Sequence, residues 1–385
     1  MKNLETLIQE LCPNGVEFVK LGDVLDYEQP TKYIVKCKDY QNEGMPVLTA
    51  GQTFILGYTD ETNGIFEASK ENPVIIFDDF TTSFHWVDFN FKVKSSAMKM
   101  LRVLSEREVS FRFVYYAMKC IKYQTLVHSR QWISKYSQIE IPLPPIEVQT
   151  EIVRILDKFT SLEAELEAEL DCRKRQYEYY RDKLLSFDNV GGQEVTISKI
   201  GDIGRICMCK RIMKNQTNSE SGIPFYKIGT FGKVADAYIS NDVYEEYKKL
   251  YSYPKKGDIL MSASGTIGRT VVFNGKPSYF QDSNIVWVDN DETKFFNSYL
   301  NYYYQIIEWK TQGGTIKRLY NNLLAGATIK YPSLEEQHRI VSILDRFESL
   351  TTSLQSGLPA EIAARRQQYE HYRDKLLTFK RKGAA

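Results

Sequence analysis

An internal repeat constrains the fold of this sequence more than any other feature. Residues 152–162 (IVRILDKFTSL) recur as residues 340–350 (IVSILDRFESL), with identity at 8 of 11 positions and an offset of 188. Residues 180–187 (YRDKLLSF) recur as residues 372–379 (YRDKLLTF), with identity at 7 of 8 positions and an offset of 192. The offset grows by four residues, which a heptad pattern absorbs as a stutter. The repeat therefore predicts a duplicated structural unit with about one extra helical turn in the second copy.

The repeated segments are predicted to be long helices that pair as a coiled coil. Apolar residues recur every three or four positions from 152 to 187, except between 166 and 177. The block Glu-Ala-Glu-Leu occurs twice in succession at 163–170, in residues with high helix propensity. In the second copy, Gly357 and Pro359 predict a break or kink, with Pro359 opening a new helix. The residues expected at the helix-pair or subunit interface are Ile152, Ile155, Phe159, Leu162, Tyr180, Leu184, Ile340, Ile343, Phe347, Leu350, Tyr372 and Leu376.

The segments before the two long helices resemble each other more faintly and are predicted to be rich in strands. Residues 75–77 (IIF) align with residues 259–261 (ILM), each before a polar loop. Short β-branched and aromatic runs bounded by Gly, Asn and Pro predict the strands, and residues 111–122 and 295–309 are expected to be helices. Each head domain is therefore predicted to be α+β.

Chain connectivity predicts how these parts are arranged. If the two long helices pair along their apolar faces, the second must run back along the first, so the pair is antiparallel. The predicted fold is α+β, with two head domains at opposite ends of an antiparallel pair of long coiled-coil helices and a pseudo-twofold repeat. The expected limits are 1–145 and 188–332 for the head domains, 146–187 and 333–379 for the helices, and 380–385 for a basic tail.

Composition narrows the class of protein. The 385 residues suffice for two to three domains, and 50 Lys+Arg against 49 Asp+Glu exclude a polyelectrolyte tail. Six cysteines without a CxxC pair favour reduced thiols in the cytosol. The start of the chain has no apolar signal region, and no apolar stretch approaches the ~18 residues of a membrane span. A soluble cytoplasmic protein without membrane partners is therefore expected.

Motifs for catalysis and metal binding were not found in the sequence. Residues 265–270 lack both the spacing and the lysine of a P-loop, and the four histidines form no HExxH motif. Asp78 and Asp79 would suit a metal pair, but they align with Ser262 and Ala263 in the second head domain, which argues against a duplicated metal site. The sequence therefore predicts neither catalytic residues nor a metal site in this chain.

Polar loops in both head domains favour contact with nucleic acid, more strongly in the second. Residues 188–333 carry 18 Lys+Arg and 14 Asp+Glu (18 − 14 = +4), whereas residues 1–145 carry 16 and 18 (16 − 18 = −2). Phosphate contacts supply much of the affinity for DNA, and basic and small polar side chains can address bases or phosphates. In the first head domain the expected DNA contacts are Thr31, Lys32, Tyr33, Gln52, Thr53, Thr81, Thr82, Arg130, Gln131 and Trp132. In the second they are Lys210, Arg211, Lys214, Lys227, Lys233, Ser262, Ser264, Thr266, Arg269, Thr315, Lys317 and Arg318.

At these residues the sequence resembles the specificity (S) subunits of type I restriction–modification systems. The resemblance covers essentially the whole chain. It rests on residues 143–149 (LPPIEVQ), which run into the repeat at 152–162, on the repeat at 180–187, and on the second copies at 334–350 and 372–379. The second head domain keeps the small-residue loop 262–268 (SASGTIG), whereas the first departs from it at 77–82 (FDDFTT).

This resemblance implies a non-catalytic subunit that recognises double-stranded DNA with a bipartite site. Each head would be a target recognition domain that reads one half-site, and the helices would dock two modification (methyltransferase) subunits and set the half-site spacing. The doubled Glu-Ala-Glu-Leu block resembles the short repeats by which family members adjust that spacing. Two restriction (translocase and nuclease) subunits are the other implied partners. S-adenosylmethionine, ATP and magnesium would act in the partner subunits, so no cofactor is expected in this chain.

Two other classes of protein stay open on the residues alone. A stand-alone metal-dependent nuclease would need a metal site that carries no recognisable motif, and DNA cleavage by the purified protein with magnesium alone would support it. A coiled-coil adaptor that binds only proteins would be excluded if the reconstituted complex retained DNA in a sequence-specific manner.

Overall fold

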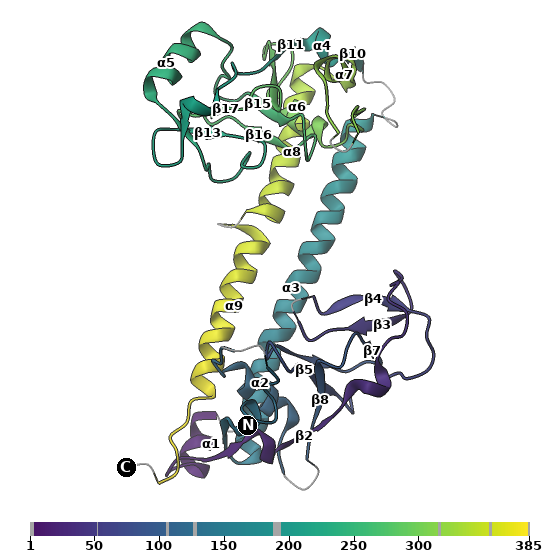
Figure 1. Ribbon diagram of the computed structural model, residues 1–385, viewed down its shortest axis with the longest axis vertical. Coiled ribbons are helices and arrows are strands. Elements are labelled where there is room, and N and C mark those ends of the chain that lie inside the picture. The colour runs from purple at the N-terminus through teal and green to yellow at the C-terminus, as the bar shows by residue number, and fades with distance from the viewer. Residues whose placement is uncertain are drawn as a thin grey trace. The chain divides into compact units, whose positions relative to one another are not determined.

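The computed structural model describes residues 4–51, 53–104, 108–125, 129–187, 194–314, 317–353 and 356–383 (Figure 1). The chain forms two compact units. Unit 1 comprises residues 1–166 and 362–385, and unit 2 comprises residues 167–361. Each unit therefore contains one head domain and a stretch from each of the two long helical regions. Among the described residues, no helix combines the length and apolar character needed to span a membrane.

The head domain of unit 1 is built on three small sheets. The largest is antiparallel with strand order β2-β8-β5-β6, and the second has the order β4-β3-β7, in which β3 and β7 run parallel. The third pairs β1 with β9. The strands are β1 (Glu17–Lys20), β2 (Leu25–Glu28), β3 (Met45–Leu48), β4 (Ile55–Thr59), β5 (Val74–Asp78), β6 (Phe84–Val87), β7 (Lys92–Val93), β8 (Met98–Val103) and β9 (Glu140–Leu143). The helices are α1 (Leu4–Leu11) and α2 (Phe111–Lys119), with 3-10 turns at Leu21–Asp23, Pro30–Tyr33 and Tyr136–Gln138.

The head domain of unit 2 repeats this plan. Its sheets have the orders β11-β18-β15-β16, β12-β14-β13-β17 and β10-β19, and β13 runs parallel to β17 as β3 does to β7. The strands are β10 (Thr196–Lys199), β11 (Gly204–Cys207), β12 (Thr217–Asn218), β13 (Ile223–Tyr226), β14 (Tyr238–Ile239), β15 (Ile259–Ser262), β16 (Thr270–Val272), β17 (Tyr279–Phe280), β18 (Ile285–Asn290) and β19 (Thr328–Tyr331). The helices are α4 (Ile200–Ile203), α5 (Asn241–Leu250), α6 (Asn297–Tyr304) and α7 (Asn321–Gly326), with a 3-10 turn at Lys214–Gln216.

The central strands β5 and β15 occupy equivalent places in the two units. Directly after β5 the amide of Asp79 donates to the Ala97 carbonyl, and directly after β15 the amide of Ala263 donates to the Asn284 carbonyl, both at 2.8 Å. The expected alignment of residues 75–77 with 259–261 therefore corresponds to equivalent strands. Strand pairing brings these segments together over long sequence separations, so the two head domains share their topology although their loops differ.

The long helices are α3 (Ile146–Ser186), α8 (Leu334–Thr352) and α9 (Gly357–Leu376). The predicted interruption of the second helical region is present, because α8 ends before α9 begins. Gly357 has a φ of +79°, and a Cβ atom there would lie 2.8 Å from the Leu350 carbonyl oxygen, so the position favours glycine. Pro359 lies in the first turn of α9, where its missing amide proton costs no helical hydrogen bond.

The helices predicted in the head domains are shorter than expected. The expected ranges were 111–122 and 295–309, whereas α2 ends at Lys119 and α6 ends at Tyr304. The Cys120 amide bonds the Ala117 carbonyl, and the Gln305 amide bonds the Tyr302 carbonyl, both at 3.1 Å. These three-residue bonds tighten the last turn and end each helix.

One face of each long helix is buried in the core of a head domain. Ile152 and Leu156 of α3 are fully buried in the core of unit 1, together with Phe113 of α2. Ile340 and Leu344 occupy the matching places in the core of unit 2. Full burial of such a side chain stabilises the fold by about 1.5–3 kcal/mol. These residues therefore join each head domain to its helix.

A second face of the helices forms the helix pair within each unit. In unit 1, Phe159 of α3 stacks on Tyr372 of α9 with ring centroids 5.5 Å apart, and Arg366 donates to Glu163. The partner number falls as the α3 number rises, so the two stretches are antiparallel. In unit 2, Tyr180 of α3 stacks on Phe347 of α8 at 5.8 Å.

Two residues predicted for the interior of the helix pair lie at its surface instead. Leu162 is 36% exposed and Leu350 is 52% exposed. In each copy the following residue turns inward: Glu163 pairs with Arg366, and Thr351 is buried. The inward face is thus displaced by one residue at this point. The other predicted interface residues, Ile155, Leu184, Ile343 and Leu376, are partly buried.

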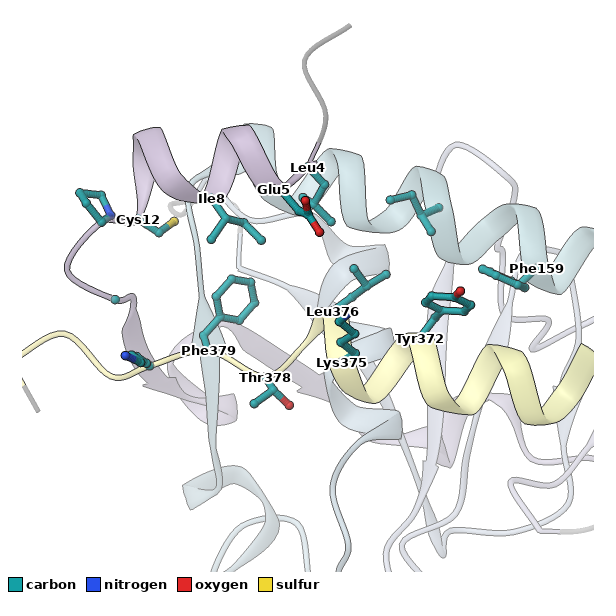
Figure 2. Close-up of a pocket in the computed structure, with 14 residues that line it drawn as sticks. Leu4, Glu5, Ile8, Cys12, Phe159, Tyr372, Lys375, Leu376, Thr378 and Phe379 are labelled. Atoms are coloured by element: carbon teal, nitrogen blue, oxygen red, sulfur yellow. The ribbon is translucent and has the colours of Figure 1, made fainter.

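In unit 1 the N-terminal helix α1 lies against the long helices. Figure 2 shows α1, α3 and α9 around a cavity of about 560 Å³, whose lining includes Leu4, Ile8, Phe159 and Phe379. The predicted basic tail is also held here. The Val16 amide donates to the Lys380 carbonyl at 2.9 Å, and the Lys382 amide donates to the Val16 carbonyl at 2.9 Å.

Candidate nucleic-acid interface

In unit 2 the loop between β15 and β16 is stapled by one serine. The Ser262 hydroxyl donates to the Thr266 carbonyl at 2.5 Å and accepts from the Arg269 amide at 3.0 Å. Ser262 and Ser264 are buried, so neither side chain reaches the surface, and both expected DNA contacts are corrected to structural roles. Thr266 is exposed. Gly268 has a φ of +85°, and a Cβ atom there would lie 2.6 Å from the indole nitrogen of Trp309.

The same loop is fastened to the turn at residues 227–233. The Arg269 guanidinium donates to the Ile228 carbonyl at 3.2 Å and lies 5.4 Å from the centre of the Phe231 ring. Lys227 forms an ion pair with Asp236 at 2.9 Å, while Lys233 is exposed. The predicted residues Lys227, Lys233 and Arg269 therefore belong to one group of loops.

Three further segments converge on residues 281–284. The Arg211 Nε donates to Asp282 Oδ2 at 2.9 Å, the Ile228 amide donates to Gln281 Oε1 at 2.9 Å, and an Arg318 Nη2 donates to Asn284 Oδ1 at 2.6 Å. The segment 281–284 thus links the loops at 210–214, 227–233 and 312–318. We call this group of loops the unit 2 loop cluster.

Most basic residues predicted in this cluster are accessible. The Arg211 side chain is 67% exposed despite its ion pair, and Lys214 and Lys317 are exposed. The Lys210 ammonium lies 4.9 Å from the centre of the Tyr251 ring. Thr315 lies outside the described residues. Gln281, Asp282 and Asn284 were missed by the sequence reasoning, since nothing in their local pattern shows which loops they hold.

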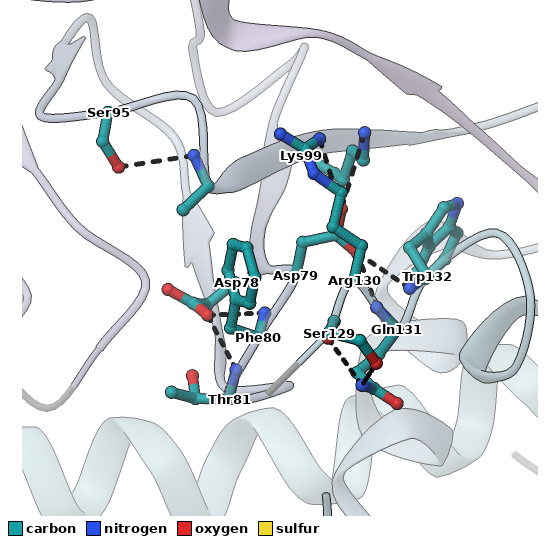
Figure 3. Close-up of polar contacts among 11 residues, drawn as sticks. Asp78, Asp79, Phe80, Thr81, Ser95, Lys99, Ser129, Arg130, Gln131 and Trp132 are labelled. Carbon is teal, nitrogen blue, oxygen red and sulfur yellow. Dashed lines mark hydrogen bonds and ion pairs between the residues drawn. The ribbon is translucent and has the colours of Figure 1, made fainter. Parts of the chain in front are cut away.

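In unit 1 the corresponding loop after β5 is a tight turn. Asp78 Oδ1 accepts from the amides of Phe80 at 2.9 Å and Thr81 at 2.8 Å (Figure 3). Thr82 has a φ of +60° and is buried, and its hydroxyl donates to the Thr81 carbonyl. Thr82 therefore shapes the turn and is corrected from the expected DNA contacts, whereas Thr81 is exposed.

The next residue, Asp79, holds a second loop. Its Oδ1 accepts from the amides of Gln131 at 3.1 Å and Trp132 at 2.8 Å. Its Oδ2 lies 3.7 Å from Lys99 Nζ and 3.7 Å from an Arg130 Nη1 atom (Figure 3). Burial lowers the pKa of Lys99, and the charge of Asp79 opposes this shift. We call Asp79, Lys99 and Arg130 the Asp79 cluster.

Two predicted contacts in this loop are corrected by their burial. Gln131 is 1% exposed and Trp132 is 2% exposed. The Trp132 ring packs on Phe77, with ring centroids 5.1 Å apart, and stacks on Tyr136. These side chains have no surface to offer DNA. Arg130, in contrast, is 52% exposed.

The remaining predicted residues of unit 1 lie in other loops. Thr31, Lys32 and Thr53 are exposed, and Gln52 lies outside the described residues. The Tyr33 hydroxyl donates to Glu28 Oε1 at 2.8 Å, and burial together with this bond raises the pKa of Tyr33. Their partners are not the residues around Asp79.

One arginine occupies the same place in both units. The Gln131 amide donates to the Asp79 carbonyl, and the Leu319 amide donates to the Ala263 carbonyl. Because Asp79 and Ala263 are equivalent, the preceding residues Arg130 and Arg318 are equivalent too. Each guanidinium is held beside a polar side chain, Asp79 in unit 1 and Asn284 in unit 2. Within the described parts of the chain, no three His, Cys, Asp or Glu side chains gather so as to hold a metal ion.

Comparison with known proteins accounts for this duplicated arrangement. The model of the type I restriction modification DNA specificity domain matches the chain twice, at residues 13–171 and 192–364. The chain belongs to the type I restriction modification DNA specificity family. Each match of this family contains one head domain and one stretch of long helix.

Individual members of the family resemble the chain over nearly its whole length. The specificity subunit of the Escherichia coli type I restriction enzyme EcoR124I/EcoR124II is 41% identical over 408 residues, covering 98% of this chain and 97% of that one. A Haemophilus influenzae protein named provisionally as a type I restriction enzyme specificity subunit is 45% identical over 397 residues, covering 98% of this chain and all 100% of that one.

Solved structures show the same fold at low sequence identity. The S subunit of a type I restriction-modification system from M. genitalium has a TM-score of 0.53 at 16% identity, covering 94% of this chain and 96% of that one. A chain from a structure of type I R-M complex assembly has a TM-score of 0.56 at 20% identity, covering 95% of this chain and 98% of that one. The predicted two-domain fold with long helices is confirmed by these neighbours.

Proposed function

We propose that this chain directs a type I restriction modification complex to its DNA target, with each unit reading one half of a bipartite double-stranded site. The chain is the non-catalytic DNA-recognition subunit of such a complex, since both units match the DNA specificity domain and the relatives are specificity subunits. The observation that carries the division into two readers is the equivalence of Arg130 and Arg318. Equivalent positions on diverged loops suit two readers of different bases.

An arginine held in this way is suited to reading bases. Its guanidinium has five N–H donors in a fixed plane, so one edge can be held by the protein while another faces DNA. Asp79 and Asn284 each approach one terminal nitrogen of the guanidinium. Paired contacts from arginine to guanine O6 and N7 contribute about 1–3 kcal/mol of discrimination. We assign this role to Arg130 in one half-site and Arg318 in the other.

The exposed basic and hydroxyl side chains around these arginines serve mainly to bind the DNA backbone. The net charge of +4 over residues 188–333 gives unit 2 the larger share of this sequence-independent affinity. The proposed contacts in unit 1 are Thr31, Lys32, Tyr33, Thr53, Thr81 and Arg130, with Gln52 assigned from sequence alone. Those in unit 2 are Lys210, Arg211, Lys214, Lys227, Lys233, Thr266, Arg269, Lys317 and Arg318, with Thr315 assigned from sequence alone.

The long helices are the proposed docking surface for protein partners. Members of this family assemble with modification and restriction subunits, and we propose two of each. Apolar side chains stay exposed at matching positions of the helices: Leu162 and Leu350, at 36% and 52%, and Tyr180 and Tyr372, both at 43%. Exposed apolar groups at repeated positions suit protein contacts. S-adenosylmethionine, ATP and magnesium are assigned to those partners.

Substituting the two arginines tests the proposed division of labour. The complex of this chain with its modification subunits is expressed in cells, and its methylated sites are mapped by sequencing. Arg130→Ala is expected to relax or abolish recognition of bases in one half-site, and Arg318→Ala of bases in the other. Lys317→Ala is the matched control, which removes a neighbouring exposed charge and is expected to weaken binding to all sequences alike.

Affinity for the mapped target checks the size of the effect. Each arginine substitution is expected to weaken binding by about 1–3 kcal/mol, as for loss of one paired base contact. Loss of recognition in the same half-site from both variants would contradict the assignment of one reader to each unit.

A further inference from the structure

A buried ion pair lies beneath the Arg130 loop. Asp79 and Lys99 are each 1% exposed, and their charged atoms are 3.7 Å apart. Within the described residues, neither Asp79 Oδ2 nor Lys99 Nζ has a hydrogen-bond partner. The Lys99 ammonium otherwise faces the Tyr27 ring, with 4.8 Å between the nitrogen and the ring centre. Burial of two charges with incomplete hydrogen bonding is costly, so this pair calls for an explanation beyond packing.

The second unit shows that the fold does not need these charges. Asp79 is equivalent to Ala263, and Lys99, which pairs with Phe77 across the sheet, is equivalent to Val286, which pairs with Met261. Ala263 and Val286 are both buried. The same place in the sheet therefore accepts two small apolar side chains. Replacement of a buried ion pair by apolar residues is often neutral or stabilising.

What the charges contact is the loop that carries Arg130. One oxygen of Asp79 accepts the amides of Gln131 and Trp132, and the other lies between Lys99 and Arg130. In unit 2 the equivalent Ala263 has no side chain to do this, and Asn284 holds the equivalent Arg318. Asn284 is equivalent to Ala97 in unit 1, which has no polar side chain. Each unit thus holds its arginine with one polar residue, on opposite strands of the sheet.

The charges within the Asp79 cluster also fix how much positive charge reaches the surface. Asp79 alone would neutralise Arg130. With Lys99 buried beside it, the three groups sum to one positive charge, and Arg130 is the exposed member. Lys99 therefore compensates the carboxylate that holds the arginine.

We propose that Asp79 is a positioning residue for DNA recognition by unit 1, and that Lys99 is the buried countercharge that leaves the charge of Arg130 available to DNA. The proposal deepens the function proposed above and rests on it. It assigns to the first recognition domain a specificity determinant that does not itself touch DNA.

A double substitution separates this role from a structural one. Asp79→Ala combined with Lys99→Val installs the pair that unit 2 carries, so no buried charge is left unpaired. The modification complex with this double variant is expected to melt close to the wild-type temperature. Asp79→Ala alone leaves the Lys99 charge buried without its partner and is expected to melt lower.

Binding to DNA gives the decisive comparison. The probes are duplexes with the target mapped from the methylated sites of the wild-type complex, and duplexes with one half-site scrambled. The double variant is expected to bind the intact target about tenfold more weakly, as for loss of one well-placed base contact. Its binding is expected to become insensitive to scrambling of the half-site read through Arg130, while sensitivity to the other half-site is kept.

Arg130→Ala in the same assay tells failure of this proposal from failure of the proposed function. If Arg130→Ala loses the half-site but the double variant reads it like the wild type, Asp79 does not position Arg130 and the inference is overturned. If Arg130→Ala also reads both half-sites normally, the assigned reader in unit 1 is wrong and the inference falls with it.

Discussion

Two buried glutamines make the same joint in both units. Gln149 Oε1 accepts the Ser110 amide and its Nε2 donates to the Pro144 carbonyl, at 2.9 and 2.7 Å. Gln337 makes the matching bonds to Phe296 and Pro332, at 2.9 and 3.1 Å. The glutamines stand out in the repeated sequence, but their partners Ser110 and Phe296 lie about 40 residues away and follow no motif. Side-chain partners of this kind were therefore not predictable.

The DNA-contact residues illustrate the same limit. Residue type and loop position identified Arg130 and Arg318 correctly as accessible arginines on equivalent loops, although their contact with DNA stays a prediction. The same criteria also selected Trp132 and Ser262, which are buried. Exposure depends on which strand or ring packs over a residue, and Phe77 and Tyr136, which cover Trp132, are set by the tertiary fold.

Two tyrosines of α6 are expected to respond in opposite ways to loss of the hydroxyl group. The Tyr302 hydroxyl donates to Asp345 Oδ1 at 2.6 Å, whereas the Tyr304 hydroxyl is buried with no hydrogen-bond partner among the described residues. Tyr302→Phe is expected to lower the free energy of unfolding by about 1–2 kcal/mol, and Tyr304→Phe to raise it by up to about 1 kcal/mol. Urea denaturation of the two variants measures both. Equal effects of the same sign would contradict the hydrogen-bond assignment.

At the level of elements, local patterns predicted the long helices well and the sheets only in part. The 3–4 residue spacing predicted α3, and Gly357 with Pro359 predicted the interruption before α9. The β-type runs at 74–77 and 284–288 correspond to β5 and β18, but their neighbours in the sheet were not predictable. Strands such as β3 and β7 are joined over more than 40 residues, and strand order depends on such distant pairing. The spacing also could not separate the helix face buried in a head domain from the face toward the second helix.

The helix pair is expected to depend on Phe347 and much less on Leu350. Phe347 stacks on Tyr180, whereas Leu350 is 52% exposed although it follows the same apolar spacing. Phe347→Ala is expected to destabilise unit 2 by about 2 kcal/mol or more, because it removes a large packed side chain. Leu350→Ala is the matched control and should cost less than about 1 kcal/mol. Thermal melting of both variants decides between these faces, and an equal loss would show that the predicted interior position of Leu350 is correct after all.

For the whole molecule, the repeat was the most informative feature of the sequence. It predicted two equivalent domains, and the two matches of the specificity domain and the matching sheet orders bear this out. The predicted limits 1–145 and 188–332 for the head domains stay predictions, since the compact units divide within α3 and α9. Composition predicted less: the net charge of +1 conceals the opposite net charges of the two head domains, which follow only once the repeat has located them.

The doubled Glu-Ala-Glu-Leu block lies in the middle of α3, and we expect its length to set the distance between the half-sites. Inserting one more block after Leu170 lengthens the helix by about 6 Å, against about 3.4 Å per base pair of DNA. The non-specific spacer should therefore grow by about one to two base pairs, while the bases read within each half-site stay the same.

The phase of the helix provides the control for this insertion. Four residues turn a helix through about 400°, so the apolar faces stay nearly aligned, whereas five residues turn it through about 500° and misalign them. The four-residue insertion should thus assemble with the modification subunits, and the five-residue insertion should assemble poorly. The methylated sequence in cells that carry each variant is the measurement. An unchanged spacer in the four-residue variant, or new bases within a half-site, would mean that α3 does not set this distance.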